Sequence, residues 1–363
     1  MRINALTLNN FRNHKNLSLN FVGPTTTIVG RNGRGKTNIV EAVNYFATLS
    51  SHRVASDQPL IQTDEISAQI TGVFEKHGRL ATAEITINQN GPNKVLLNKS
   101  ALPKPRDLLG LVNAVVFAPE DLALVKGEPT DRRKFLDDFS VLLSPKFSNT
   151  RSEYDRALKQ RNSLLKSAGR KELSTTAKAT LAVWDEQLIT LGTQIVEQRI
   201  NSLKLLTPFI SQHGATLSDS HEPLIINYSA KWLTDLENNI GEQLSDALEQ
   251  KHKEEIDRGM TLVGPHRDEL EINLSGMPAK GYASHGQSWS ISLAMRIATF
   301  NVLREHDDDP ILILDDVFAE LDQHRRTRLL NALTNVEQTL ITAAVVEDLP
   351  DGLVGEQIVL ADN

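Results

Sequence analysis

The 363-residue sequence contains no cysteine, which excludes disulfides and thiolate metal sites. Aromatic residues make up only 5% of the chain, and no run of roughly 18 apolar residues is present that could span a bilayer. The first ten residues also lack the apolar core of a secretory signal peptide. We therefore expect a soluble, cytoplasmic protein with no membrane partner. The apolar fraction of 40% is sufficient for a packed core.

There is no excess of positive charge, because the 39 Lys and Arg residues are outnumbered by 46 Asp and Glu residues, for a net charge of −7. No overall positive field then attracts nucleic acid, so any DNA contact must come from local clusters. Two clusters are candidates for contact with DNA phosphates: Arg132, Arg133 and Lys134, and Arg325, Arg326 and Arg328. The alternative is that both are solvated helix faces with local salt bridges. The absence of aromatic residues among these clusters favours backbone contact over base recognition.

A complete phosphate-binding loop, G-x-x-x-x-G-K-T, occupies residues 30–37. A β-branched segment at 25–29 precedes it, and apolar residues at helical spacing follow it, as this loop requires. Its glycines allow backbone N–H groups to surround phosphate oxygens at a helix N-terminus. The predicted nucleotide-binding residues are Gly30, Arg31, Asn32, Gly33, Arg34, Gly35, Lys36, Thr37 and Asn38. The alternative is a glycine-rich turn with an incidental lysine.

A second element of the same site is predicted at Asp315 and Asp316, which follow the apolar segment 310–314. Ligands of open α/β sheets bind at the carboxyl ends of buried parallel strands. We expect Asp315 to hold Mg²⁺ together with the Thr37 hydroxyl. Asp316 is then placed to orient or deprotonate an attacking water, and Lys36 reaches the β- and γ-phosphates. The alternative is an aspartate pair that caps a helix or a turn.

A third element, Ser284-His285-Gly286-Gln287, stands at the start of a helical pattern. A hydroxyl and a glycine at a helix N-terminus favour an anion site, which makes Ser284, Gly286 and Gln287 candidates for nucleotide contact. A plain capped turn is the alternative for this segment.

The remaining sequence predicts a discontinuous α/β head with an inserted helical arm. Alternating apolar residues before position 100 predict two strands ahead of the loop and an antiparallel meander after its helix. Residues 119–259 are helical in pattern, with apolar seams at 147–165 and 181–195 that predict two antiparallel helices of about three heptads each, reversing near 167–170. Two amphipathic helices packed on a globular core are the alternative. We expect the head to comprise 1–118 and 260–363.

These motifs, in this order, resemble the head of an ATP-binding-cassette ATPase, with Ser284-His285-Gly286-Gln287 as signature motif, Asp315-Asp316 as Walker B and Glu320-Leu321-Asp322 as D-loop. Within that group the chain resembles the RecF family of DNA replication and repair proteins. The matching segments are Asn10-Phe11-Arg12-Asn13, residues 117–122, 125–127, 132–133, 264–268 and 314–318. The resemblance implies that Arg12 contacts nucleotide; a surface strand residue is the alternative. The chain departs from the family pattern at Thr342-Ala343-Ala344, because the family usually has a more polar, threonine-rich switch segment after the last strand.

The resemblance further implies an ATP-dependent homodimer, in which Ser284 and Gly286 contact the γ-phosphate held by the other copy. It implies weak ATPase activity, binding to DNA at single-stranded gaps or single-strand/double-strand junctions, and cooperation with recombination mediators that load recombinase. Two alternatives remain from the same group: a transporter ATPase subunit and an SMC-like chromosome clamp. The 250 residues between Lys36 and Gly286 disfavour the transporter, and the short predicted arm disfavours the clamp.

Overall fold

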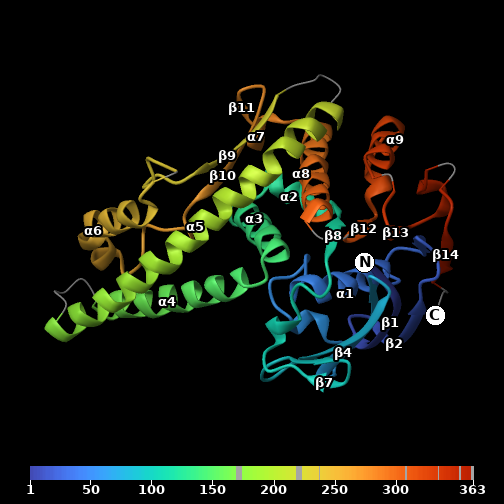
Figure 1. Cartoon of the computed structure of the whole chain (residues 1–363), viewed down its shortest axis with the longest axis horizontal. Helices are drawn as coiled ribbons and strands as arrows, with labels where there is room; N and C mark the ends of the chain where they lie inside the picture. Colours follow the sequence, from blue (N-terminus) through green and yellow to red (C-terminus); the bar gives the residue numbers. More distant parts are fainter. Residues whose placement is uncertain are drawn as a thin grey trace.

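The computed structural model describes residues 1–168, 174–217, 223–236, 238–306, 309–333, 335–350 and 353–360. Two sheets and helix α1 form one end of an elongated molecule, and helices α4 and α5 project from it (Figure 1). Within the described ranges, no helix is both long enough and apolar enough to cross a membrane.

The central layer is a five-stranded, wholly parallel sheet. Its order is β14 (Glu356–Val359), β3 (Thr25–Val29), β13 (Thr339–Ala343), β12 (Ile311–Asp315) and β8 (Ala114–Phe117). β8 and β12 are apolar along almost their whole length and buried, as is usual for parallel strands with both faces covered, whereas the edge strand β14 is partly exposed. In β12, Ile311 and Ile313 pack toward α1 (Lys36–Thr48), whereas Leu312 and Leu314 pack toward α8 (His285–His306).

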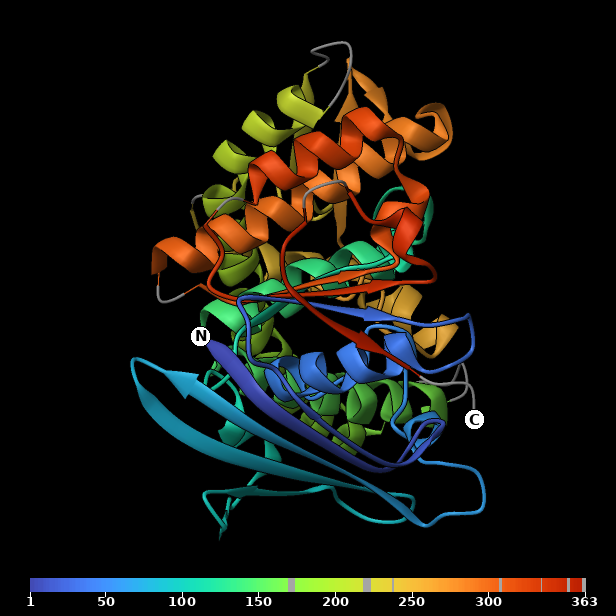
Figure 2. The same cartoon turned by 90° about the vertical axis from the view of Figure 1, so that its right-hand side faces the viewer.

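A six-stranded antiparallel sheet covers the other side of α1. Its order is β2 (His14–Asn20), β1 (Arg2–Phe11), β4 (Ser67–Lys76), β5 (Arg79–Asn88), β6 (Lys94–Leu97) and β7 (Ser100–Ala101). Figure 2 shows the resulting layers of antiparallel sheet, α1, parallel sheet and then α8 with α9 (Gln323–Ala332). The predicted strands before the loop and the predicted meander after α1 are both confirmed.

The segment 119–259 is mainly helical, as predicted, with α2 (Ala123–Lys126), α3 (Pro129–Leu143), α4 (Phe147–Ala168), α5 (Thr175–Leu217) and α6 (Ile240–Arg258). It also contains β9 (Leu224–Ser229), which pairs with β10 (Glu269–Leu274) in a small sheet completed by β11 (Met277–Pro278). Short turns of helix complete the fold: Gln58–Leu60, Pro105–Leu108, Pro119–Leu122, α7 (Ala279–Tyr282), Val317–Glu320 and Val346–Asp348.

The two predicted seams do pack together. Phe147, Tyr154, Leu188 and Ile195 form one buried cluster, and Leu165 and Leu181 form another nearer the tip. The predicted length of three heptads fits α4, with 22 residues, but is wrong for α5, which has 43. Helix α6 also packs on both, so the arm is not a simple helix pair. Gly169 and Arg170 of the predicted reversal lie outside the described residues. The head and arm boundaries stay a prediction.

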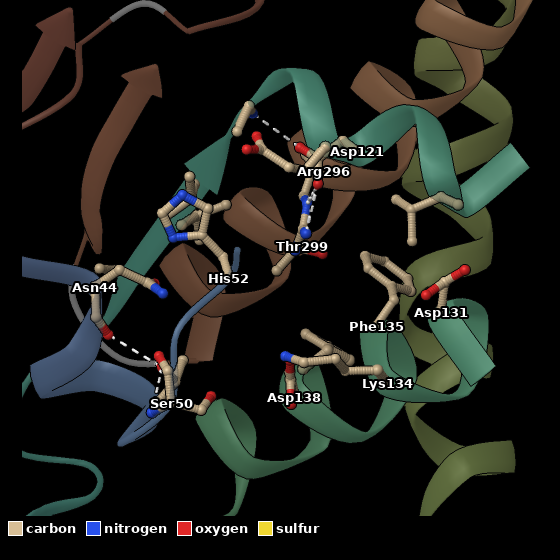
Figure 3. A pocket seen from close by; sticks show the side chains of 18 of the residues that line it. Asn44, Ser50, His52, Asp121, Asp131, Lys134, Phe135, Asp138, Arg296 and Thr299 are labelled. Atoms are coloured by element: carbon tan, nitrogen blue, oxygen red, sulfur yellow. Dashed lines mark hydrogen bonds and ion pairs between the residues drawn. The ribbon is translucent and has the colours of Figure 1, made fainter. Parts of the chain in front are cut away.

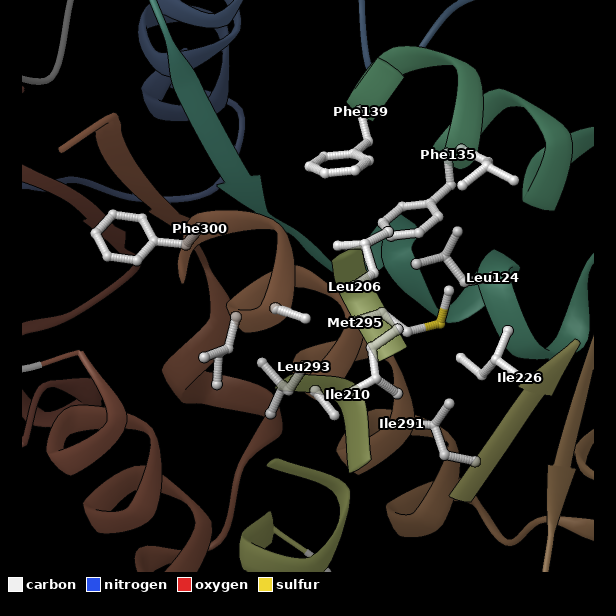
Figure 4. Close-up of a cluster of buried hydrophobic side chains, with 14 of the residues drawn as sticks. Leu124, Phe135, Phe139, Leu206, Ile210, Ile226, Ile291, Leu293, Met295 and Phe300 are labelled. Carbon is white, nitrogen blue, oxygen red and sulfur yellow. The ribbon is translucent and has the colours of Figure 1, made fainter. Parts of the chain in front are cut away.

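The second half of α5 leaves the arm and packs along α8. Figure 4 shows Leu206 and Ile210 of α5 among Ile291, Leu293 and Met295 of α8, with Phe135 and Phe139 of α3 alongside. The second half of α5 therefore belongs to the buried core of the head, and this helix joins the arm to the head.

Candidate nucleotide-binding site

The phosphate-binding loop connects β3 to α1, as the sequence predicts. Gly33 and Gly35 have φ values of 84° and 91°, a region that side chains other than glycine rarely adopt. A Cβ atom on Gly35 would lie 2.3 Å from His14 Nε2, because the β1–β2 turn packs directly against the loop. Asn13 Nδ2 donates a hydrogen bond to the Gly33 carbonyl at 3.3 Å, and His14 Nε2 lies 3.0 Å from the Gly35 carbonyl. The loop is therefore held from outside, with glycine at the positions that its curvature requires.

Lys36, the first residue of α1, folds back over this loop. Its Nζ donates to the Arg31 carbonyl at 3.5 Å and to Asn32 Oδ1 at 3.4 Å. Both bonds are long for a charged donor, so phosphate oxygens can replace these partners at little cost. The position of the amine over the loop agrees with its predicted role.

The two predicted Mg²⁺ ligands meet. Thr37 Oγ1 donates a hydrogen bond to Asp315 Oδ1 at 3.0 Å, and Thr342 Oγ1 donates to the same oxygen at 2.6 Å. β13, which lies between β3 and β12, brings Thr342 to this edge beside Asp315. Burial raises the pKa of Asp315 to about 6, and the charge of Asp316 adds to the rise, while the two hydroxyls oppose it. This contact of Thr342 was not predicted from the sequence, although a threonine near the end of the neighbouring parallel strand is a usable signal.

Asp316 follows in a left-handed conformation, with φ 50° and ψ 20°. Its backbone N–H donates to Thr342 Oγ1 at 2.9 Å. Its Oδ1 atom is buried and, among the described residues, has no hydrogen-bond partner. Burial raises the pKa of Asp316, and the Lys36 ammonium opposes that rise. A buried carboxylate oxygen without a donor, next to a phosphate-binding loop, is suited to receive a ligand or a water.

The signature turn forms a capped helix start. The Gln287 N–H donates to Ser284 Oγ at 3.2 Å, and the Ser284 N–H donates to Gln287 Oε1 at 2.8 Å, which is a capping box for α8. The capped turn given as the alternative is therefore present, and the nucleotide contacts of Ser284, Gly286 and Gln287 stay predictions. Lys126 Nζ, from α2, lies 3.1 Å from His285 Nδ1 in the same turn.

Arg12 is placed beside the loop, but its guanidinium faces α1. It makes two hydrogen bonds to the buried Glu41 carboxylate, at 2.8 Å and 2.6 Å, and a third to the Pro59 carbonyl. This arrangement is neither an exposed strand residue nor a group turned to the loop. Contact between Arg12 and a nucleotide stays a prediction.

The six arginines and lysines proposed for DNA all have partners within the chain. Arg132 is a correction, because its side chain is buried, ion-paired with Glu269 at 2.7 Å and hydrogen-bonded to carbonyls at the end of α2, where it cannot reach DNA. The other five also have partners. Two of them form ion pairs, Lys134 with Asp138 and Arg325 with Asp322. The remaining three donate hydrogen bonds to backbone carbonyls: Arg133 to that of Asp268, Arg326 to that of Leu321 and Arg328 to that of Leu217. Lys134 keeps 45% of its side-chain surface exposed, so it remains the most accessible candidate.

A cleft of about 280 Å³ opens between α1, α3 and α8 (Figure 3). Asp121, on one wall, binds Arg296 Nη2 at 2.6 Å and accepts the Ala118 N–H. On another wall both ring nitrogens of His52 are buried and, within the described part of the chain, lack a hydrogen-bond partner. Burial lowers the pKa of His52.

Arg53 connects the wall of this cleft to the nucleotide site. It lies 3.3 Å from Glu120 Oε1 and donates to Asn38 Oδ1 at 3.2 Å. Neither His52 nor Arg53 was assigned a role from sequence, because the pattern gives no indication of what lies opposite this loop.

Residues 264–268 lie at the base of the arm instead of at the nucleotide site. Tyr154 of α4 is 2.8 Å from His266 Nδ1, and Arg199 of α5 donates to the Pro265 carbonyl at 2.7 Å. Tyr228 and Trp232 both donate to the Asp268 carboxylate. This motif therefore joins the arm helices to the small sheet.

A phosphate-binding loop and an aspartate pair on a parallel sheet, flanked by an antiparallel sheet and by a signature turn on α8, define an ATPase head of the cassette and SMC type. A family model described as the RecF/RecN/SMC N-terminal domain matches residues 2–350. The DNA replication and repair protein RecF of Streptomyces avermitilis is 43% identical over 368 residues, which cover 100% of this chain and 99% of that protein. The chain belongs to the RecF family of DNA replication and repair proteins, which confirms the resemblance seen in the sequence.

Solved structures agree. The recombination mediator protein RecF with ATP, in the RecFOR pathway, superposes with a TM-score of 0.88 at 28% identity, over 97% of this chain and 93% of that one. The Smc head domain of Pyrococcus furiosus, bound to the C-terminal domain of ScpA, superposes with a TM-score of 0.51 at 16% identity, over 94% and 89% of the two chains. The second likeness concerns the fold alone, and it confirms the predicted class.

Proposed function

We propose that this chain binds ATP with Mg²⁺ at residues 30–38 and Asp315, and that it acts as a cytoplasmic DNA repair and replication protein. The contact between Thr37 and Asp315 carries the proposal. These residues are 278 positions apart in the sequence, yet a hydroxyl and a carboxylate oxygen lie 3.0 Å apart at the end of the phosphate-binding loop. Mg²⁺ in nucleotide sites takes one or two protein oxygens together with phosphate oxygens, so this pair fits the ion. A RecF structure solved with ATP supports the choice of nucleotide.

The residues of this chain have distinct tasks in such a site. Loop amides and Lys36 bind the phosphates, and Thr37 and Asp315 hold the ion, which neutralises phosphate charge when bound. Asp316 orients or deprotonates the attacking water through its unpaired Oδ1 atom. Aspartate has a shorter reach than glutamate, so we expect weak ATPase activity and a switch instead of a fast enzyme.

ATP is proposed to hold two copies together. The sequence contains one phosphate-binding loop and one signature turn, so each site is completed by Ser284 and Gly286 of the other copy. ADP lacks the γ-phosphate, so hydrolysis removes the interaction that distinguishes the dimer from the monomer. Membership of the RecF family supports this arrangement over the transporter alternative.

The proposed substrate is DNA at single-stranded gaps or single-strand/double-strand junctions, with recombination mediators as partners in loading recombinase. Support comes from the names of the relatives, RecF as a DNA replication and repair protein and as a recombination mediator. Affinity should fall steeply with salt, because backbone contact releases counterions. Binding to a gapped duplex that is independent of salt, or equal to binding of intact duplex, would contradict this part.

Sedimentation of the full chain with and without ATP and Mg²⁺ tests the dimer. We expect dimers at micromolar protein with ATP, and monomers with ADP. Lys36→Ala should lose both ATP binding and assembly, whereas Ser284→Ala should bind ATP as a monomer and fail to assemble. Ser174→Ala is the matched control, because Ser174 likewise accepts an N–H at the start of a helix, α5. Monomers throughout would overturn the proposal.

A further inference from the structure

The guanidinium of Arg325 lies directly against the signature turn. A Cβ atom built on Gly286 would be 2.7 Å from Arg325 Nη2 and 3.0 Å from Cζ. Distances under 3.0 Å are essentially absent between real Cβ atoms and their neighbours, so the glycine permits this packing. Arg325 belongs to α9, which follows the aspartate pair and the D-loop. A residue next to the D-loop therefore contacts the signature turn.

Asp322 fixes the orientation of Arg325. Its Oδ2 atom pairs with Arg325 Nη1 at 2.8 Å, and its Oδ1 atom accepts the Arg325 N–H at 2.9 Å as the N-cap of α9. The Arg325 side chain is 21% exposed. The guanidinium is thus held between a carboxylate of its own helix and the first turn of α8.

The segment that joins Asp316 to Asp322 is short and well packed. Val317 and Phe318 are buried in a single helical turn, and Leu321 is buried after it. Arg326 Nε donates to the Leu321 carbonyl at 2.9 Å. This short segment, anchored by its buried apolar residues, is a continuous packed connection between Asp316 and Asp322.

Packing alone does not favour this position for a cation. The N-terminus of α8 carries the positive end of the helix dipole, which disfavours a guanidinium nearby. Lys126 adds a second positive charge through its contact with His285. The Asp322 carboxylate offsets part of this cost, so the arrangement is held by specific contacts at a place where charge opposes it.

We propose that Arg325 is a positioning residue that links the nucleotide site of one chain to the signature turn of the same chain. In the dimer of the proposed function, on which this inference rests, that turn contacts the nucleotide of the other copy. Arg325 then couples the two nucleotide sites, since the path runs from Asp316 through Asp322 and Arg325 to Gly286. Coupling of this kind is demonstrated when the effects of two substitutions on dimerisation depend on each other.

The first measurement compares ATP affinity of the monomer with ATP-driven dimerisation of the full chain. Arg325→Ala should weaken dimerisation about tenfold or more and leave the ATP affinity of the monomer within about twofold. Arg304→Ala is the control, because it removes an arginine–aspartate pair (with Asp309) at the other end of α8. It should change neither quantity. Dimerisation of Arg325→Ala at the wild-type level would overturn the proposal.

A double-variant cycle tests whether Arg325 acts through Gly286. Gly286→Ala should weaken dimerisation, because its Cβ atom displaces the guanidinium from its place against the turn. Gly286→Ala/Arg325→Ala should then dimerise no worse than Arg325→Ala alone, since the obstructing side chain is gone. Losses that multiply would mean that the residues act independently, which would overturn the link.

Hydrogen exchange separates this link from the dimer itself. At concentrations where the wild type is monomeric, ATP should alter exchange of residues 284–288 in the wild type and leave it unchanged in Arg325→Ala. If no dimer forms under any condition but this difference appears, the dimer of the proposed function fails and the link stands. If both chains respond alike, the link fails whether or not the dimer forms.

Discussion

Charged side chains are buried in two regions of this molecule, and they are treated differently in each. In the arm, Arg161 is 1% exposed and pairs with the fully buried Glu255 at 2.7 Å, and at the base of the arm Arg199 pairs with Asp137 at 2.7 Å. At the nucleotide edge, Asp315 is 2% exposed but receives only hydroxyl hydrogen bonds, and no described residue forms an ion pair with it.

The difference separates a structural role from a binding role. A buried pair neutralises itself and specifies one packing of the helices that carry it. Burial raises the pKa values of Asp315 and of the half-buried Asp316, the latter despite the nearby Lys36 ammonium, and raised pKa values of this kind are typical of binding sites. The ion pairs of the arm fix the packing of its helices, whereas the carboxylates at the nucleotide edge are available to bind a ligand.

The largest effect should come from breaking an arm pair. Arg161→Ala leaves the Glu255 carboxylate buried without its cation, which should lower the free energy of unfolding by about 3–5 kcal/mol in urea titrations. ATP binding well below the melting temperature should be unaffected. Glu254, which precedes Glu255 in α6, is the control, because it pairs with Lys251 and Arg258 on the surface. Glu254→Ala should produce no measurable change.

A double replacement distinguishes charge from volume in this result. Arg161→Met/Glu255→Met removes both charges while keeping apolar bulk, and it should recover most of the lost stability. If the double variant is as unstable as Arg161→Ala, this ion pair is not what stabilises the arm.

The local parts of both regions could be predicted from sequence, and their distant partners could not. The loop, its flanking strand and helix, and the strand before Asp315 follow from short patterns. Arg161 falls on the predicted arm seam, but nothing local indicates that Glu255 will reach it. β9 was missed because, among the described residues, it pairs only with β10, which lies beyond the arm in the sequence. The α5 helix continues past Pro208, where sequence favours an end, because its apolar residues pack on α8.

Clusters of charge are the clearest failure of local reasoning. Arg132, Arg133 and Lys134 read as one basic cluster, yet only Lys134 is exposed. Glu269, which holds Arg132, is 137 residues away in the sequence. Counting charges along the chain cannot show which of them are neutralised by partners that only the fold brings close.

Two titratable residues at the base of the arm, Asp268 and His266, should make the free energy of unfolding depend on pH. Burial raises the pKa of Asp268 from 3.8 to about 6 and lowers the pKa of His266 from 6.5 to about 4. Between pH 4 and 6 the folded state thus binds extra protons at Asp268 and fewer at His266. Rising pH therefore lowers stability through Asp268 and raises it through His266. In the wild type the two contributions nearly cancel.

Single variants should separate them. With His266→Gln, Asp268 remains, and the free energy of unfolding should fall relative to the wild type by up to about 3 kcal/mol as pH rises from 4 to 7. With Asp268→Asn it should rise over the same range by a similar amount. Urea titrations at several pH values check the two slopes. Slopes of the same sign would show that these groups are not desolvated as the structure indicates.

The smallest effect should come from the nucleotide edge, and its sign is the sharpest test of the comparison. Asp315→Asn keeps an oxygen for the Thr37 and Thr342 hydroxyls but removes a buried charge that has no cation. At pH 7, with EDTA and without nucleotide, the free energy of unfolding should therefore increase by about 1–2 kcal/mol. Asp137→Asn at the arm base should lower it, because Arg199 then loses its counterion. Denaturant titrations measure both.

With ligand present, the wild type should become more stable than Asp315→Asn. ATP and Mg²⁺ should raise the thermal midpoint of the wild type and leave that of Asp315→Asn nearly unchanged, because a ligand stabilises only a chain that binds it. Asp137→Asn should still respond, since its defect lies away from the phosphate-binding loop. If Asp315→Asn and Asp137→Asn change stability in the same direction, a missing cation is not what distinguishes the two regions, and burial alone must account for both.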